Sequence, residues 1–172
     1  NYFKWLGCKQ EADAIETFNV IENLEVDQRD WIIIDHYGIN SLWQNQLLQL
    51  FNKEKPRICV IDDLANRQHI ASLVIDQGYT GNPQVDPYEK LTHDSCLRLL
   101  GPAYALLDPI FNKLKQKVRE RTEIKRVLVY FGSVDKFCLT NCTLNVFNDE
   151  CLKEIIVDVV LPANNANFRE VQ

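Results

Sequence analysis

The sequence predicts an α/β protein made of two Rossmann-like domains, both of them incomplete within these 172 residues. Three apolar stretches carry this prediction: residues 31–34, 57–61 and 127–131. They run without alternation, as do the strands of parallel sheets that helices cover on both faces. Each stretch is followed by polar residues, and ligands of open α/β sheets bind outside the carboxyl ends of the strands. We therefore expect the site where these strands end.

Composition indicates a folded protein with a substantial core, because 46% of the residues are hydrophobic and 25% are charged. The formal net charge of −5 disfavours non-specific binding to nucleic acid, which needs a basic surface. No apolar run approaches the roughly 20 residues that span a bilayer. We expect a cytoplasmic protein without membrane or nucleic-acid partners.

The six cysteines are expected to be reduced thiols in a protein of this class. Cys138 and Cys142 are four residues apart, but neither a histidine nor a second cysteine pair accompanies them. This favours buried or half-buried thiols over a metal site. We expect neither a metal nor another cofactor. The chain contains no methionine, which indicates that it is part of a longer protein.

The first domain is expected to begin with a helix or an irregular connection at residues 13–26, where apolar and acidic residues mix. After the strand at 31–34, Ser41 can cap a helix that runs to Phe51. A short connection then leads into the strand at 57–61, which completes a right-handed βαβ unit.

Shorter elements complete this domain. A helical pattern covers residues 68–74 and overlaps a short third strand at 73–77. Residues 78–87 are rich in turn formers and predict a surface loop. The apolar stretch at 97–107 is interrupted by a Gly-Pro turn, and we expect it to pack against the body of the domain.

A charged segment at residues 112–126 is expected to separate the two domains. Its seven basic residues would suit a phosphate or nucleic-acid patch, but interleaved acidic residues and the lack of aromatic ones favour a solvated helix and linker. We place the first domain at 1–118, the linker at 119–126 and the second domain at 127–172.

The second domain is expected to open with a βαβ unit. A strand at 127–131 precedes a Gly132-Ser133 turn, a helix at 139–153 and a strand at 155–161. Backbone N–H groups and a helix N-terminus meet at such a turn, so it can cradle a phosphate. It carries neither the GxGxxG nor the GxxxxGKS signature.

Seven polar side chains follow the first two strands: Asp35, His36, Tyr37, Asp62, Asp63, Arg67 and His69. Carboxylates accept hydrogen bonds from hydroxyls, and arginine pairs with anions, so this set suits a polyhydroxylated ligand. Paired carboxylates can also divide the acid and base roles of glycoside hydrolysis. In a purely structural alternative, Asp62 and Asp63 cap the following turn and Arg67 pairs with one of them.

Five motifs occur in a characteristic order: WIIIDHYGIN, VIDDLANRQH, DQGY, CLRLLGPAYALLDPIF and VLVYFGSVD. In this order they resemble the UDP-2,4-diacetamido-2,4,6-trideoxy-β-L-altropyranose hydrolase family of pseudaminic acid biosynthesis. Related spore-coat polysaccharide proteins share the pattern. The resemblance runs from about residue 31 to residue 135 and extends toward Val160.

The resemblance implies a GT-B-like pair of Rossmann-like domains, with the sugar on the first and the nucleotide on the second. It implies hydrolysis of a UDP-linked diacetamido-trideoxy hexose by water attack at the anomeric carbon, without a metal or cofactor. The site residues that it implies are catalytic Tyr37, Asp35 and His36, substrate-binding Asp63, Arg67 and His69, and nucleotide-binding Gly132 and Ser133.

Three departures from the family pattern limit what this chain can do by itself. The family's catalytic histidine belongs to a GxGHxxR segment that the chain lacks. The family's FGGSD motif is one glycine short here, and Asp108 replaces the arginine of LLRPEF. We expect the parent protein to be the hydrolase and this chain alone to be inactive. The alternatives are a non-catalytic nucleotide-sugar-binding or remnant module and a GT-B glycosyltransferase.

Overall fold

The computed structural model describes residues 2–24, 27, 29–52, 54–79, 81–82, 84–163 and 165. It divides the chain into two compact units, Asn1–Asp108 (unit 1) and Pro109–Gln172 (unit 2). Residues 166–172, which belong to the second expected domain, lie outside the described residues, as do residues 25 and 26 of the first expected helix.

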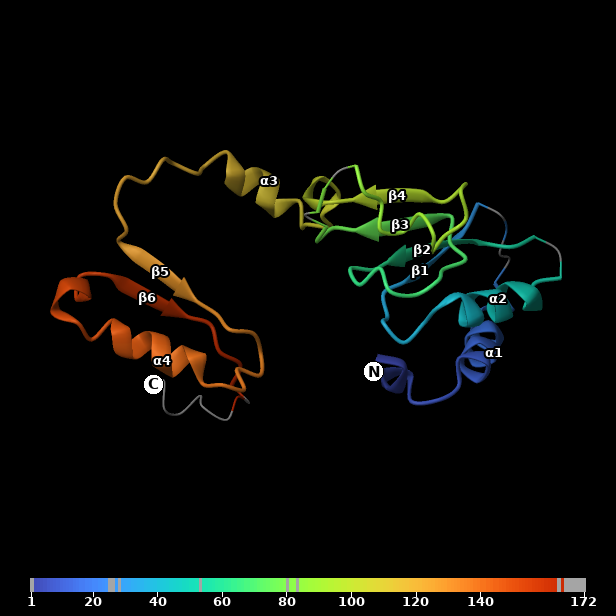
Figure 1. The fold of residues 1–172 in the computed structure, drawn as a ribbon, viewed down its shortest axis with the longest axis horizontal. Coiled ribbons are helices and arrows are strands. Elements are labelled where there is room, and N and C mark those ends of the chain that lie inside the picture. The colour runs from blue at the N-terminus through green and yellow to red at the C-terminus, as the bar shows by residue number, and fades with distance from the viewer. Residues whose placement is uncertain are drawn as a thin grey trace. The chain divides into compact units, whose positions relative to one another are not determined.

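Unit 1 is built on a four-stranded parallel sheet with the strand order β1-β2-β3-β4 (Figure 1). The strands are β1 (Trp31–Ile34), β2 (Arg57–Ile61), β3 (Leu73–Asp76) and β4 (Leu97–Leu100). All neighbours pair in parallel, so all carboxyl ends lie at one edge of the sheet. The predicted α/β class with a parallel sheet is therefore confirmed for this unit. Of the 97–107 stretch, residues 97–100 join the sheet as β4, whereas the side chains of Tyr104, Leu106 and Leu107 are exposed.

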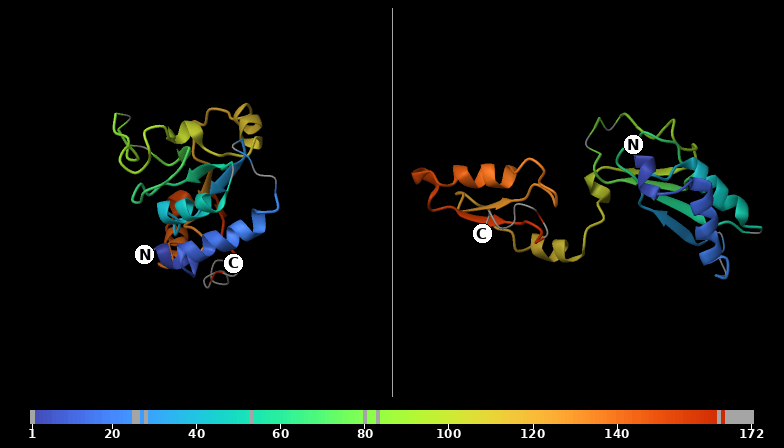
Figure 2. Two further views of the ribbon diagram at one scale, coloured as in Figure 1. Left: turned by 90° about the vertical axis from the view of Figure 1, so that its right-hand side faces the viewer. Right: turned by 90° about the horizontal axis from the view of Figure 1, so that it is seen from below.

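Two helices, α1 (Gln10–Ile21) and α2 (Ser41–Leu50), pack against each other and on one face of this sheet (Figures 1 and 2). The indole N–H of Trp43 in α2 donates to Asp13 Oδ1 of α1 over 2.7 Å. The core between helices and strands is formed by these buried residues: Ala14, Ile34, Trp43, Leu47, Ile58, Val60 and Val74. This layer holds the ends of β1 and β2 in place.

The prediction that helices cover both faces of the first strand is wrong. The side chain of Ile34 is buried, whereas Ile33 is 66% exposed and Trp31 40% exposed. Successive strand residues point to opposite faces, and α1 and α2 lie on one of them only. The apolar run therefore identified the strand correctly but not its covering.

Two local predictions around α2 are also corrected. The residue that caps α2 is Asn40 and not Ser41, because the Asn40 side chain accepts the Leu42 N–H at 2.8 Å. The segment 68–72 is not helical. Its backbone bonds to other segments instead, since Gln68 O accepts the Ser41 N–H and the His69 N–H donates to Leu91 O, both at 2.8 Å.

Unit 2 contains α3 (Ile110–Lys115), β5 (Arg126–Val129), α4 (Leu139–Val146) and β6 (Ile156–Val159). Strands β5 and β6 pair in parallel, which is the expected βαβ arrangement, but α4 ends well before residue 153. The basic segment at 112–126 is exposed throughout. Within the described ranges, no helix has both the length and the apolar character needed to cross a bilayer.

Candidate functional site

A hollow of about 230 Å³ opens at the carboxyl ends of β1, β2 and β3. Three of its lining residues are carboxylates, so we call it the acidic hollow. Its lining consists of Asp35, Tyr37, Ile61, Asp62, Asp63, Gln77 and Gly78. The structure therefore brings together Asp35 and Tyr37 after β1 with Asp63 after β2, as the parallel strand order requires.

Tyr37 and Asp63 form the central contact of the acidic hollow. The Tyr37 hydroxyl donates to Asp63 Oδ1 over 2.7 Å, although the two residues are 26 positions apart. This bond to a carboxylate is the main cause that raises the pKa of Tyr37 to about 12, with burial second. Tyr37 is therefore a neutral phenol at pH 7 and serves as a hydrogen-bonding group, not as a base.

An aromatic cluster adjoins this contact. The rings of Tyr2 and Trp5 lie against each other with centroids 4.9 Å apart, and both contact the Tyr37 ring, at 5.1 and 5.9 Å. Trp5 is 63% exposed, which is unusual for so large an apolar side chain. Sequence analysis missed Tyr2 and Trp5, because no motif includes them and only the high density of aromatic residues near residue 1 could have signalled them.

Asp62 is buried beneath the hollow and has a structural role. Its Oδ1 lies 2.7 Å from Arg67 Nη1, and its Oδ2 accepts the Ala65 N–H at 3.1 Å. Arg67 in turn donates from Nε to Ile39 O over 2.8 Å. The turn-capping alternative is thus confirmed for Asp62, with Arg67 as its partner. Arg67 lies behind the hollow wall, where it ties the loop after β2 to the loop after β1.

Tyr88 joins the ends of β2 and β3 and was not recognised from the sequence. This fully buried residue places its hydroxyl 3.0 Å from Asp62 Oδ2 and 3.2 Å from Asp76 Oδ2. Burial is the main cause that raises the pKa of Tyr88 and of Asp76. These contacts of the Tyr88 hydroxyl hold the carboxylate of Asp62 in place and connect the ends of β2 and β3 at the base of the hollow.

Two histidines of the predicted site lie outside the acidic hollow. The half-buried His36 accepts the Gly38 N–H on Nδ1 at 3.1 Å, a bond that shapes the turn after β1. His69 is 4% exposed and lines a different cavity. The structure therefore groups Asp35, Tyr37 and Asp63 and separates His36 and His69 from them.

Gly132 and Ser133 lie in unit 2, in the turn after β5. Two N–H groups of the first turn of α4 donate to the carboxylate of Asp135, from Leu139 at 2.9 Å and from Thr140 at 3.0 Å. The pKa of Asp135 is lowered, first by hydrogen bonding with the Thr140 side chain and further by these two backbone N–H groups. The carboxylate of Asp135 thus accepts the same backbone N–H groups that a bound phosphate would need. Nucleotide binding at Gly132 and Ser133 stays a prediction.

Within the described residues, no group of three or more His, Cys, Asp or Glu side chains is arranged to hold a metal ion. All six cysteines are free thiols. Comparison of the sequence with protein-family models and with curated proteins gives no match. The geometry of the acidic hollow and the motif resemblance are therefore the grounds on which a function can be proposed.

Proposed function

We propose that unit 1 binds the sugar of a UDP-linked sugar in the acidic hollow, as part of a nucleotide-sugar hydrolase. The observation that carries this proposal is the Tyr37–Asp63 hydrogen bond at the mouth of a cavity that joins the ends of three strands. The motif resemblance adds the reaction class, and a GT-B-like pairing of the two units belongs to the same proposal.

The chemistry of the hollow suits a hydroxylated ring. The second oxygen of Asp63 and the carboxylate of Asp35 can accept hydrogen bonds from sugar hydroxyl or amide N–H groups. The Tyr37 oxygen can accept a further one while it donates to Asp63. The exposed ring of Trp5 offers a flat apolar surface to the C–H face of a pyranose.

In the proposed reaction, the oxygen of a water molecule forms a bond to the anomeric carbon. The bond from that carbon to the β-phosphate oxygen breaks, and UDP leaves with the electron pair. Because its phenol is neutral, Tyr37 orients the sugar or the water and does not remove the proton. In the family that the chain resembles, the base is a histidine of a GxGHxxR segment, which this chain does not contain. This chain therefore supplies the positioning groups.

One observation favours a second candidate, a module that binds a nucleotide sugar without turning it over. Asp135 already accepts two amides at the start of α4, where a phosphate cradle was expected. If this carboxylate excludes the diphosphate, binding depends on the sugar and not on UDP.

The decisive experiment follows UDP release from a UDP-linked 2,4-diacetamido-2,4,6-trideoxy hexose. A protein that joins a GxGHxxR segment to this chain is expected to release UDP without any acceptor, and its Tyr37→Phe variant to release it at least tenfold more slowly. Release that requires an added sugar acceptor would indicate a glycosyltransferase. Binding of the substrate without release would indicate the binding module.

A further inference from the structure

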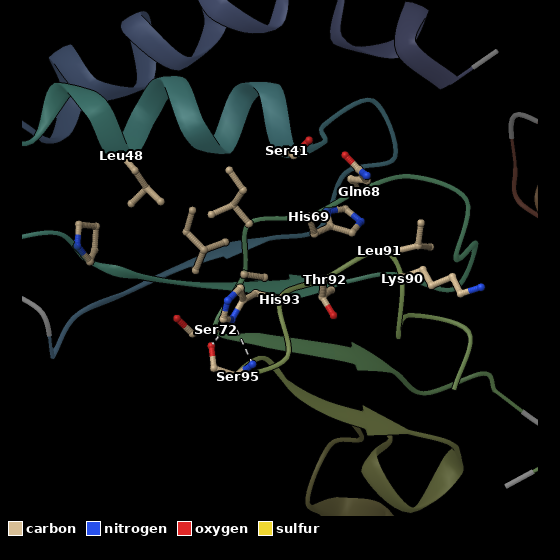
Figure 3. A pocket seen from close by; sticks show the side chains of 14 residues that line it. Ser41, Leu48, Gln68, His69, Ser72, Lys90, Leu91, Thr92, His93 and Ser95 are labelled. Atoms are coloured by element: carbon tan, nitrogen blue, oxygen red, sulfur yellow. Dashed lines mark hydrogen bonds between the residues drawn. The ribbon is translucent and has the colours of Figure 1, made fainter. Parts of the chain in front are cut away.

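A second cavity in unit 1, of about 590 Å³, lies between α2 and the loops that precede β3 and β4. Figure 3 shows Ser41 and Leu48 of α2 on one side of it and Thr92, His93 and Ser95 on the other. None of its fourteen lining residues is acidic, although Asp and Glu outnumber Lys and Arg in the chain by 24 to 19. We call it the donor cavity, because its polar lining consists of hydroxyl, imidazole, amide and ammonium groups.

The tautomer of His69 follows from its neighbours. The backbone N–H of Ile70 can only donate, and it contacts Gln44 Oε1 at 2.6 Å, so the amide nitrogen of Gln44 must face His69. That nitrogen lies 3.1 Å from His69 Nδ1, which therefore accepts. His69 carries its hydrogen on Nε2, and burial lowers its pKa to about 4, with Arg67 as the second cause. At pH 7 it is a neutral donor.

The Nε2–H group of His69 is a donor for which the described residues supply no acceptor. Within the described part of the chain, the buried Nε2 of His69 has no hydrogen-bond partner. A buried N–H group without a partner is costly, and such groups are rare without a water, ion or ligand to satisfy them. Because this atom is buried, an acceptor in the donor cavity reaches it only after a neighbouring side chain shifts, and it then gains a hydrogen bond that the described residues do not supply.

His93 has the same tautomer on the far side of the cavity. The backbone N–H of Ser95 donates to His93 Nδ1 over 3.2 Å, so that nitrogen is an acceptor and the hydrogen of the neutral ring is on Nε2. The Ser95 hydroxyl lies 2.8 Å from the same nitrogen, as Figure 3 shows. Lys90 adds a positive charge to the lining.

We propose that the donor cavity binds a small organic anion, a carboxylate or a phosphate ester with an apolar body. Its oxyanion is held by Lys90 and by the Nε2–H group of His93, and none of the described lining residues is a carboxylate that would repel it. Its apolar part packs on Leu48, Pro56 and Ile58. The volume lies within the range of roughly 300–1,000 Å³ that is usual for small-molecule sites. This site is independent of the sugar site proposed above.

The test uses benzoate and phenyl phosphate as probes, with benzyl alcohol as a neutral control, at pH 7.5. The chain has three histidines, so the imidazole nitrogens can be assigned by long-range ¹H–¹⁵N NMR. We expect either anion to shift the signals of His69 and His93 and to leave those of His36 unchanged. The stronger of the two probes then identifies the oxyanion as carboxylate or phosphate.

Two variants distinguish a specific binding site from non-specific attraction of the anionic probes to lysine side chains. Lys90→Gln removes the only ammonium among the described lining residues and is expected to weaken the affinity of the better probe about tenfold. Lys9→Gln, an exposed lysine that precedes α1, is the matched control and should leave it unchanged. Equal binding of benzyl alcohol, equal loss in both variants, or the absence of shifts at His69 and His93 would each overturn the proposal.

Discussion

The acidic hollow and the donor cavity belong to the same unit and have opposite chemistry. The hollow gathers Asp35, Asp62 and Asp63 at the ends of β1 and β2, whereas none of the described lining residues of the donor cavity is a carboxylate. Asp62 and Arg67 form a buried ion pair beneath the hollow, and His69, two residues further on, reaches the other cavity. The segment 62–69 thus contributes residues to both sites, Asp62 and Asp63 to the acidic hollow and Gln68 and His69 to the donor cavity.

The largest effect is expected from Arg67→Met, which breaks the connection beneath the acidic hollow. The variant leaves the buried carboxylate of Asp62 without its cation, so the free energy of unfolding should fall by about 3–5 kcal/mol. Urea denaturation measures this. Arg29→Met, in an exposed ion pair, is the control and should change stability by less than about 1 kcal/mol. Equal effects of the two variants would show that the buried pair does not organise the loop.

The pH dependence of stability tests whether the buried His69 is neutral, as its role in the donor cavity requires. The folded-state pKa of His69 is lowered to about 4, chiefly by burial, from an ordinary value near 6.5. Below 6.5 the unfolded chain therefore binds a proton that the folded one does not. Stability from this group is complete above pH 6.5 and falls by up to about 3 kcal/mol as the pH drops to 4.

Denaturation at pH 4.5, 5.5 and 7 tests this prediction. In His69→Gln the difference in stability between pH 4.5 and pH 7 should shrink, whereas the exposed His93→Gln should keep the wild-type profile. An unaltered profile in His69→Gln would mean that His69 titrates normally and is not a neutral donor at low pH.

Gln44→Leu tests the two hydrogen bonds of the Gln44 side chain, to Ile70 and to His69, that set the His69 tautomer. It removes the acceptor of the partly buried Ile70 N–H and the donor to the buried His69 Nδ1, so stability should fall by about 2 kcal/mol. The exposed Gln49→Leu is the matched change on the same helix and should be nearly neutral. Nitrogen NMR should also show His69 losing its Nε2–H preference, a change that a packing defect alone would not produce.

Tyr37→Phe should have the smallest effect on stability. It removes one hydrogen bond to Asp63 in a partly solvated place, worth about 1 kcal/mol or less in unfolding free energy. Affinity for UDP should stay unchanged while affinity for the sugar falls. A loss of UDP affinity as well would place Tyr37 near the nucleotide and contradict its assignment to the sugar.

Some residues of the candidate site could be predicted from the sequence, and others could not. Asp35, Tyr37 and Asp63 were predictable, because they follow apolar strand runs and parallel strands bring such ends together. Tyr2, Trp5 and Tyr88 were not, since their positions depend on tertiary packing of irregular segments with no sequence period. The non-helical course of 68–72 was missed for the same reason, as its backbone bonds to Ser41 and Leu91 replace those of a helix.

The exposure of Ile33 has a different cause. An apolar run reports strand propensity, but the number of covered faces depends on where helices lie, which local sequence does not encode. In unit 2 the strands were predicted closely, whereas α4 stops early. Its last carbonyls accept from Phe147 and Asn148, which close the helix before the turn at Glu150–Leu152.

The most direct test of the central claim is calorimetric titration of this chain with UDP-N-acetylglucosamine, in the wild type, Asp63→Asn and Asp94→Asn. If the acidic hollow holds the sugar, Asp63→Asn should weaken binding about tenfold, while the exposed control Asp94→Asn leaves it unchanged. UDP alone should bind equally to all three proteins. Equal affinities of the three proteins for the UDP-sugar would contradict the claim and remove the acidic hollow from sugar recognition.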